Sequence, residues 1–241
     1  MTFTSFFKSL IPLSLKTEFR NRLGVPSQNK SLISLKNLGF TPRVILDIGA
    51  YEGYWAREMK TIFPNARIMM LEGQTSKNNI LDLVCRKNIG IDYKIALLGA
   101  NEKPVNFNIY DTASSVLEEN YETGALVEPR ELVSLDSLLC NTFYSEPDFI
   151  KIDTQGYEIE VLKGAKNTLK FAHVILLEVS LIDIYKNCPL VADVIAYMAN
   201  CDFVLYDICS LMRRPLDGAL YQSDFLFVRK DSTLRNNKKW T

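Results

Sequence analysis

Residues 44–53 constrain the fold of this chain more than any other stretch. A short apolar run leads into Asp47 and a turn that contains Gly49 and Gly53, and a helical pattern begins near Tyr54. An apolar strand, a glycine-containing turn and a helix in this order are typical of the first unit of a nucleotide-binding α/β domain. We therefore expect a parallel sheet whose ligand site lies at the carboxyl ends of the strands.

The sequence beyond residue 40 continues this pattern, because apolar strand-like runs alternate with helical stripes. Such alternation is typical of a parallel sheet that is covered by helices on both faces. An irregular segment, 98–135, interrupts it and contains one short strand. Strands are predicted over residues 43–48, 66–72, 91–97, 105–110, 148–153, 173–179, 202–208 and 223–229.

Length and composition fit one large domain with short additions. The chain has 241 residues, and its 28 Lys and Arg residues balance 28 Asp and Glu residues. This neutral charge gives no basic surface for nucleic acid, so we expect no nucleic-acid partner. Five scattered cysteines without CxxC spacing suit a reducing cytoplasm rather than a disulfide framework or a zinc site. The single histidine, His173, excludes Ser-His-Asp and multi-histidine metal chemistry.

The amino-terminal region carries an apolar stripe at helical spacing, formed by Phe3, Phe6, Phe7, Leu10 and Ile11. We interpret residues 1–39 as a helical extension that docks on the domain or on a second subunit of a homodimer. Peripheral membrane contact through residues 1–11 is the alternative. No apolar run approaches the ~20 residues of a membrane span. The domain itself is predicted over residues 40–230, followed by a basic tail at 231–241.

The first turn also indicates the charge of the ligand. Asp47 and Glu52 place negative charge where a dinucleotide pyrophosphate would be repelled and a cation favoured. S-adenosylmethionine carries a sulfonium and an ammonium group, which makes this site a candidate methyl-donor site. Glu72 ends the second strand 23 residues beyond Gly49, where a carboxylate can accept both ribose hydroxyls of an adenosine ligand. The candidate cofactor-binding residues are Asp47, Gly49, Ala50, Tyr51, Gly53, Glu72, Gly73 and Ala96.

The second informative segment is 148–158, an alternating strand followed by a turn and a helix. Asp153 lies at the carboxyl edge of the sheet, and Glu178 ends the next strand in the same way. An alcohol acceptor must lose its proton during methyl transfer, and a carboxylate can take it. The candidate catalytic residues are Asp153, Glu178, Lys151 and Glu158. A structural ion pair of Lys151 with Glu178 is an equal alternative, and a magnesium ion shared by Asp153 and Glu178 is another that no spacing requires.

Together these segments resemble the FkbM-type S-adenosylmethionine-dependent methyltransferases over residues 40–230. The resemblance is carried by an ordered set of motifs rather than by one of them. The set comprises Leu46-Asp47-Ile48-Gly49-Ala50-x-x-Gly53, Leu71-Glu72, Ser114-Ser115-Val116-Leu117, Val133-Ser134-Leu135-Asp136-Ser137-Leu138, the 148–158 run, Val161-Leu162-Lys163-Gly164-Ala165, Leu177-Glu178-Val179 and Asp224-Phe225-Leu226-Phe227.

The resemblance implies a class I methyltransferase sheet of seven strands, mostly parallel, with the last strand antiparallel and helices on both faces. It also implies donor binding around Asp47, Gly49, Gly53 and Glu72, and O-methylation of a sugar unit of a glycolipid, polysaccharide or lipo-oligosaccharide, or of a hydroxylated natural product. The chain departs from the family pattern at two positions. Tyr51 stands where asparagine is frequent, and Gln155 stands where glutamate is frequent and so removes one candidate base.

Two other classes of function remain open from the sequence. An NAD-dependent oxidoreductase could use Glu72 to hold its ribose, although GxGxxG is missing and the turn is acidic. A catalytically inactive partner protein could keep the donor fold, with Tyr51 as its best support. On the acceptor side, Tyr110, Tyr121, Tyr185 and Tyr221 suit sugar stacking or simple loop packing. Arg213 and Arg214 could bind an acidic group on the acceptor or remain solvated.

Overall fold

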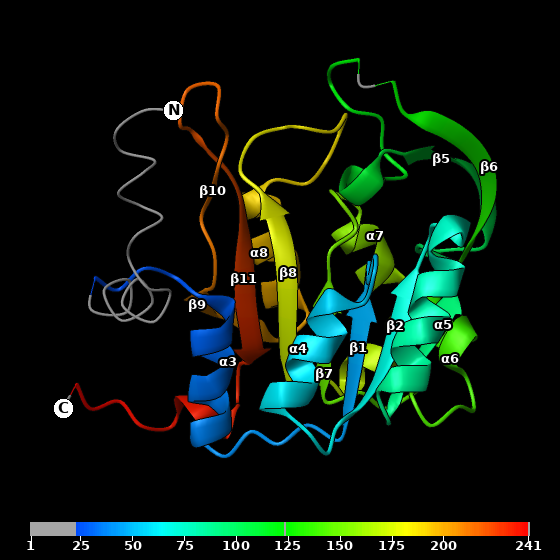
Figure 1. Cartoon of the computed structure of the whole chain (residues 1–241). Coiled ribbons are helices and arrows are strands. Elements are labelled where there is room, and N and C mark those ends of the chain that lie inside the picture. The colour runs from blue at the N-terminus through cyan, green and yellow to red at the C-terminus, as the bar shows by residue number, and fades with distance from the viewer. Residues whose placement is uncertain (1–22, 123, 241) are drawn as a thin grey trace, which may run out of the picture.

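A twisted, mostly parallel sheet runs through the middle of the fold and separates two layers of helices (Figure 1). The computed structural model describes residues 23–122 and 124–240. The sheet order is β3-β2-β1-β7-β8-β11, and β11 runs antiparallel to its neighbour β8, as predicted for the last strand. The strands of this sheet are β1 (Val44–Ile48), β2 (Arg67–Glu72), β3 (Ile91–Ile95), β7 (Phe149–Ile152), β8 (Val174–Ser180), β9 (Phe203–Ile208), β10 (Met212–Arg213) and β11 (Leu220–Arg229).

The sheet has eight strands where seven were predicted, because its outer edge is interrupted. Both β9 and β10 pair with β11, β9 with residues 225–229 and β10 with Leu220 and Gln222. The two short strands therefore share one edge position. The predicted architecture, a class I methyltransferase sheet with helices on both faces, is otherwise confirmed.

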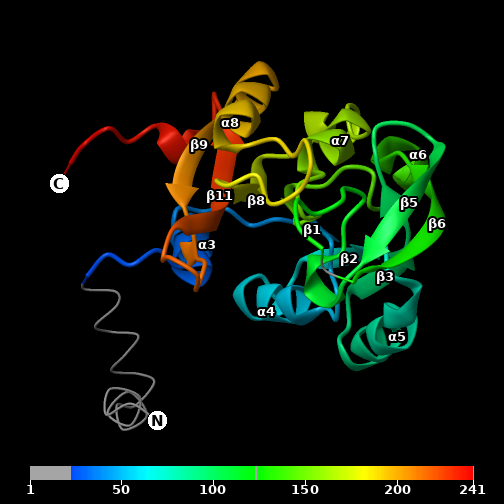
Figure 2. The ribbon, with the colours of Figure 1, turned by 90° about the horizontal axis from the view of Figure 1, so that it is seen from above.

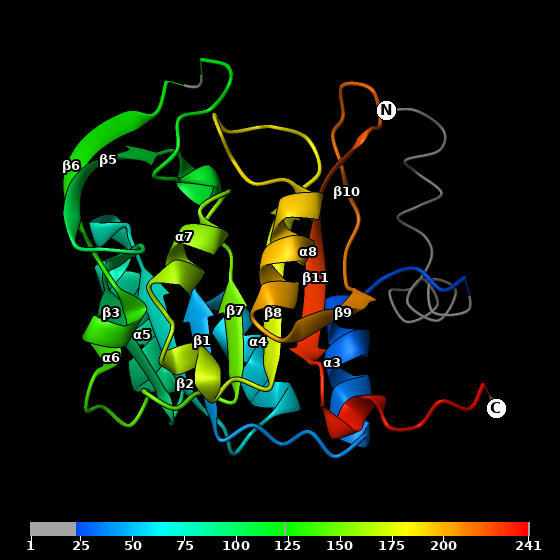
Figure 3. The same ribbon diagram turned by 180° about the vertical axis from the view of Figure 1, so that it is seen from behind.

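Helices cover both faces of the sheet, α3, α4 and α5 on one and α6, α7 and α8 on the other (Figures 2 and 3). Alternation along β1 explains the two layers, since Leu46 and Ile48 belong to one hydrophobic cluster and Ile45 to the other. The α-helices are α3 (Gln28–Asn37), α4 (Tyr54–Ile62), α5 (Asn78–Lys87), α6 (Leu135–Leu139), α7 (Glu158–Lys163) and α8 (Val191–Asn200). Short 3₁₀ turns are η1 (Thr75–Lys77), η2 (Asp111–Ala113), η3 (Thr168–Lys170) and η4 (Thr233–Arg235).

A second, three-stranded sheet occupies the segment predicted to be irregular. It consists of β4 (Leu97–Leu98), β6 (Leu126–Val133) and β5 (Lys103–Ile109) in that order. The prediction that Ala96 and Leu97 close the third strand is corrected, because β3 ends at Ile95 and Leu97 starts the small sheet. The strand β6 escaped prediction because it contains Pro129 and charged residues, and most of its side chains are at least partly exposed.

The helix α3 packs on the sheet through Leu32 and Leu35, which are fully buried. The predicted stripe at residues 3–11 lies outside the described residues. Within the part of the chain that the structure describes, none of the helices combines the length and the apolar character that crossing a bilayer requires.

Candidate functional site

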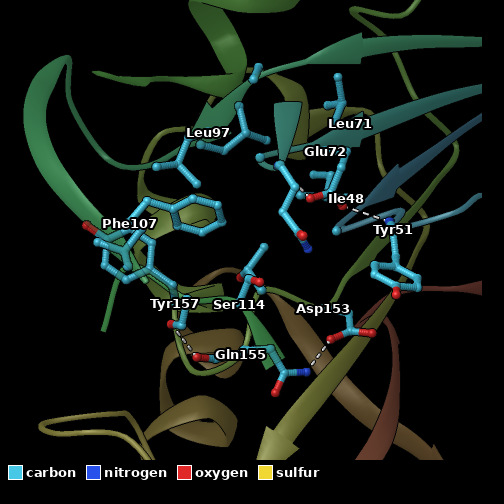
Figure 4. Close-up of a pocket in the computed structure, with 18 of the residues that line it drawn as sticks. Ile48, Tyr51, Leu71, Glu72, Leu97, Phe107, Ser114, Asp153, Gln155 and Tyr157 are labelled. Atoms are coloured by element: carbon cyan, nitrogen blue, oxygen red, sulfur yellow. Dashed lines mark hydrogen bonds between the residues drawn. The ribbon is translucent and has the colours of Figure 1, made fainter. Parts of the chain in front are cut away.

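A cavity lies where the carboxyl ends of β1, β2 and β7 meet beneath the small sheet (Figure 4). It encloses about 760 Å³ out to its mouth, within the range of small-molecule sites. Its wall is polar near β1 and β7 and apolar near β4 and β5. Residues of the wall are Ile48, Gly49, Tyr51, Leu71, Glu72, Gly73, Gln74, Ala96, Leu97, Leu98, Phe107, Thr112, Ser114, Ser115, Val116, Asp153, Thr154, Gln155 and Tyr157.

The turn after β1 is built around close backbone contacts. Gly49 has φ 73°, and a Cβ atom there would lie 1.8 Å from the carbonyl oxygen of Asp153. Gly53 has φ 71°, and its Cβ would lie 2.8 Å from the Sδ atom of Met70. Both positions therefore require glycine for conformation and for space. Gly49 lies on the cavity wall, but its closest approach is to the backbone after β7, whereas Gly53 and the buried Ala50 lie behind the wall.

Asp47 is fully buried and has no place on the cavity wall. It stands in register with Lys151 on the neighbouring strand, and its Oδ1 lies 3.2 Å from Lys151 Nζ. Burial raises the pKa of Asp47, and the charge of Lys151 opposes that rise. The charge of Asp47 is therefore balanced inside the sheet, and its predicted contact with a ligand stays a prediction.

Lys151 connects β1 to the loop that follows β7. Its Nζ lies 3.4 Å from Oδ2 of Asp153 and donates a hydrogen bond to the carbonyl oxygen of Gly49 at 2.9 Å. Burial lowers the pKa of Lys151, but Asp47 and Asp153 outweigh it, so the ammonium stays charged. The ion pair with Glu178 that we considered is replaced by pairs with Asp47 and Asp153.

Glu72 is held with its carboxylate on the cavity wall at the end of β2. The backbone N–H of Tyr51 donates to its Oε2 at 2.7 Å, and that of Gln74 donates to its Oε1 at 2.8 Å. Burial raises the pKa of this carboxyl, and the two amide donors oppose the rise. Each oxygen keeps a further lone pair that can accept a hydrogen bond from a ligand hydroxyl. Glu72 is therefore fixed in place and can still bind a ligand.

Tyr51 supplies a backbone donor that does not depend on its side chain. Its backbone has φ 50°, and its hydroxyl hydrogen-bonds to the carboxylate of Asp111 in η2. Lys77 Nζ lies 3.6 Å from the centre of its ring and 3.0 Å from Oε1 of Glu52. The residue that fitted the expected family pattern least well thus ties the turn after β1 to the segment that crosses the cavity.

The apolar end of the cavity is formed by Ala96, Leu97 and Phe107. Gly73 permits this arrangement, since a Cβ there would lie 2.8 Å from Leu97 Cδ1 and 3.1 Å from Phe107 Cζ. Phe107 was missed by sequence reasoning, because β5 reads as an isolated short strand. Figure 4 shows Leu97 and Phe107 across the cavity from Tyr51, with Glu72 between the two ends.

The polar end brings together Asp153, Gln155 and Glu178. Gln155 Nε2 donates to Oδ1 of Asp153 at 2.8 Å and also to Oε2 of Glu178 (Figure 4 shows the bond to Asp153). Burial and the charges of neighbouring acids raise the pKa of Glu178 well above its usual value. From the sequence, Gln155 was noted only because it replaces a possible acidic residue. In the structure its amide lies between the carboxyl groups of Asp153 and Glu178, in the position that a magnesium ion shared by them would need.

Glu158 lies away from the cavity wall and is buried. Its Oε1 accepts the N–H of Thr154 at 2.9 Å and the N–H of Gly156 at 3.1 Å. It therefore closes the turn between β7 and α7. Burial raises its pKa to about 7, against the opposing effect of these donors. The structure gives this residue a role in shaping the turn and no place on the cavity wall.

A second cavity adjoins the first and is lined by segment 108–122, Ala125 and residues 185–186. Tyr110 and Tyr121 are exposed on it, while Tyr185 is buried. The hydroxyl of Tyr185 donates to Oε1 of Gln155 at 2.8 Å, which connects the walls of the two cavities. The two arginines considered for binding an acidic group on the acceptor make contacts within the β10–β11 turn instead. Arg214 pairs with Asp217 at 2.7 Å, and Arg213 Nη1 donates to the carbonyl oxygen of Gly218 at 2.9 Å.

Among residues 23–122 and 124–240, no three His, Cys, Asp or Glu side chains gather in a way that could hold a metal ion.

The sheet order, the reversed last strand and a cavity at the carboxyl ends of β1 and β2 define a class I methyltransferase fold. The sequence matches the family described as the Methyltransferase FkbM domain over residues 47–205. The protein therefore belongs to the FkbM methyltransferase family.

Solved structures agree with this fold. The chain is similar to methyltransferase FkbM from Methylobacillus flagellatus KT, with a TM-score of 0.50 and 19% identity, over 76% of this chain and 43% of that one. It thus spans less than half of that protein.

Two other solved methyltransferases align over more of their own length. Precorrin-6y C5,15-methyltransferase from Geobacter metallireducens GS-15 has a TM-score of 0.48 and 13% identity, over 82% of this chain and 86% of that one. The 1,6-didemethyltoxoflavin-N1-methyltransferase from Burkholderia thailandensis has a TM-score of 0.48 and 10% identity, over 91% of this chain and 85% of that one. A comparison with curated proteins gave no match.

Proposed function

We propose that this protein is an S-adenosylmethionine-dependent O-methyltransferase that methylates a hydroxyl of a sugar unit in a glycolipid, polysaccharide or lipo-oligosaccharide. The observation that carries the proposal is the position of Glu72. Its carboxylate is fixed by two backbone amides in the middle of a cavity that is apolar at one end and acidic at the other. Adenine would fill the apolar end at Leu97 and Phe107, and the ribose hydroxyls would bind Glu72.

The methionine portion of the donor would then point toward Gly49, Tyr51 and Asp153. Its sulfonium and ammonium charges suit this end, because Asp153 keeps part of its carboxylate surface open. The family membership favours methyl transfer over the NAD-dependent alternative, and Glu72 is compatible with both ligands.

The reaction needs little from the protein beyond alignment and removal of one proton. The acceptor oxygen would attack the methyl carbon of S-adenosylmethionine, the carbon–sulfur bond would break, and neutral S-adenosylhomocysteine would leave. The hydroxyl proton passes to the carboxylate of Asp153, the candidate base that reaches the cavity. Lys151 pairs with that carboxylate at 3.4 Å and helps to hold it in place.

A sugar acceptor is supported by the second cavity. Tyr110 and Tyr121 offer aromatic faces, and Glu118 and Glu119 offer hydroxyl acceptors, beside the wall that carries Gln155. The five cysteines are unpaired, in keeping with the cytoplasmic location that we propose.

Calorimetry with S-adenosylmethionine, S-adenosylhomocysteine and NAD⁺ tests the donor. We expect both adenosyl ligands to bind and NAD⁺ not to bind; tight NAD⁺ binding alone would overturn the proposal. Glu72→Gln should weaken S-adenosylhomocysteine binding roughly 10- to 100-fold, the range for one lost hydrogen bond to a charged group. Glu131→Gln, an exposed glutamate of β6, is the matched control.

Transfer of a labelled methyl group to glycolipid and oligosaccharide acceptors, with hydroxylated polyketides in parallel, tests the acceptor. Transfer of the label to polyketides but not to the sugar acceptors would instead support a natural product as the substrate. Asp153→Asn should lower kcat much more than donor affinity; an equal loss of both would assign Asp153 to donor binding instead.

A further inference from the structure

Gln155 is held at every polar atom of its side chain, which is unusual for a residue on a loop. Its amide nitrogen donates to Asp153 Oδ1 at 2.8 Å and to Oε2 of Glu178. Its amide oxygen accepts the hydroxyl of Tyr185 at 2.8 Å and Nε2 of Gln222 at 3.4 Å. Five residues from separate parts of the fold therefore form one network.

The orientation of this amide follows from its surroundings. Two carboxyl groups on one side can be satisfied only by the NH₂ end, so the oxygen must face Tyr185 and Gln222. Ser115 Oγ fixes the backbone by donating to the carbonyl oxygen of Gln155 at 2.8 Å, and the residue has φ 55°. A non-glycine residue in the left-handed region is strained, and such strain persists only where surrounding contacts hold it.

The network lies in a strongly acidic part of the site. Burial raises the pKa of Glu178, and three neighbouring acids raise it further. Lys151 Nζ lies 3.4 Å from Oδ2 of Asp153, so the nearest cation of this cluster pairs with Asp153. The titratable and charged groups that face Glu178 are Asp153 and Lys151 from β7 and its loop, Glu158 from α7, Asp224 and Tyr221 from β11, and Tyr185.

We propose that Gln155, oriented by Tyr185 and Gln222, is a positioning residue that holds the carboxyl group of Asp153 in place as the proton acceptor and ties it to the carboxyl group of Glu178. This inference rests on the proposed function and adds to it. Gln155 donates to both carboxyls without being able to titrate, so it holds them in place and cannot take the proton itself. A glutamate at this position would add a third acid that competes for that proton.

Two variants and one control test this arrangement. Gln155→Glu should move the acid limb of the pH profile for methyl transfer upward by roughly one unit or more, because three carboxyls must share protons. Tyr185→Phe should lower kcat roughly 10-fold with KM for S-adenosylmethionine unchanged, because the amide loses the donor that orients it. Tyr197→Phe, a half-buried tyrosine on α8, should do neither.

Carboxyl ¹³C NMR titration of the full chain without acceptor gives a second readout, with Asp153→Asn and Glu178→Gln assigning the two signals. We expect Gln155→Glu and Tyr185→Phe each to change the titration midpoints of Asp153 and Glu178. Midpoints equal to those of the wild type would overturn the proposal, as would changed midpoints with an unchanged pH profile. Absence of methyl transfer by the wild type would instead overturn the proposed function. The NMR midpoints would still show whether Gln155 couples the carboxyl groups of Asp153 and Glu178. If Tyr185→Phe fails to fold, Gln155→Glu carries both measurements.

Discussion

The first cavity and the second cavity are built by different kinds of structure. The first cavity is walled mainly by turns that follow β1, β2 and β7, and its glycines and buried carboxylates are fixed by backbone contacts. The second cavity is walled by loops whose contacts are exposed, such as the Glu118–Lys186 ion pair. Side chains of the first therefore support the fold, whereas the exposed side chains of the second, such as Tyr110 and Tyr121, contribute little to it.

The largest expected effect is at Gly49. Gly49→Ala places a methyl group 1.8 Å from a backbone oxygen that cannot move aside cheaply. We expect a loss of more than about 5 kcal/mol in the free energy of unfolding, enough to prevent folding. Gly218→Ala is the control, since it has φ 74° with nothing within 4 Å and should lose only about 1 kcal/mol. Equal urea midpoints for the two variants would contradict the role of the contact.

Removing Lys151 should come next in size. Lys151→Met leaves Asp47 buried without a partner, which should lower the free energy of unfolding by about 4 kcal/mol. Urea unfolding measures the loss. Adding Asp47→Leu to this variant should recover much of it, because an apolar pair replaces an unpaired charge. A double variant as unstable as the single one would show that Lys151 stabilises the fold mainly through Asp153.

Glu158 should make stability depend on pH. Its pKa in the folded protein is about 7, above the usual value of 4.5. Its contribution is therefore fully present below pH 4.5 and is lost as pH rises toward 7, by on the order of 3 kcal/mol. Glu158→Gln cannot titrate, so it should gain stability relative to the wild type across this window. Parallel curves of the free energy of unfolding against pH for the wild type and Glu158→Gln would rule out this titration.

The smallest effect is expected on the acceptor side. Tyr121→Ala removes an exposed ring, so it should change the free energy of unfolding by less than about 0.5 kcal/mol. Calorimetry should show unchanged S-adenosylhomocysteine affinity, while KM for the acceptor rises. A clear loss of donor affinity would contradict the division between the two cavities.

The sequence predicted the first two strands and the turn after β1 well, because there local pattern and tertiary structure agree. The apolar runs before Asp47 and Glu72 form β1 and β2, and the glycines lie in the turn where they were expected. The direct contact of Asp47 with a cationic ligand stays a prediction. Its pairing with Lys151 was not predicted, because the two residues are 104 positions apart in the chain and align only in neighbouring strands of the sheet.

The remaining misses have the same origin. Phe107 and Gln155 acquire their positions from the small sheet and from Tyr185, neither of which has a local sequence signal. The strand β6 is half exposed and contains Pro129, so its composition resembles a loop. Side-chain roles that depend on partners distant in the chain could therefore not be predicted from the sequence, even where the motif itself was recognised.

The interrupted edge formed by β9 and β10 also bears on how molecules of this protein meet one another. A long, regular edge strand offers unpaired N–H and C=O groups to a foreign chain and so promotes intermolecular pairing. Here the pairing register shifts on both short strands, between Leu226 and Phe227 opposite β9 and between Met212 and Arg213 within β10. The opposite edge, β3, is short and carries Asp92 and Lys94. Neither margin of the sheet is a good template for aggregation.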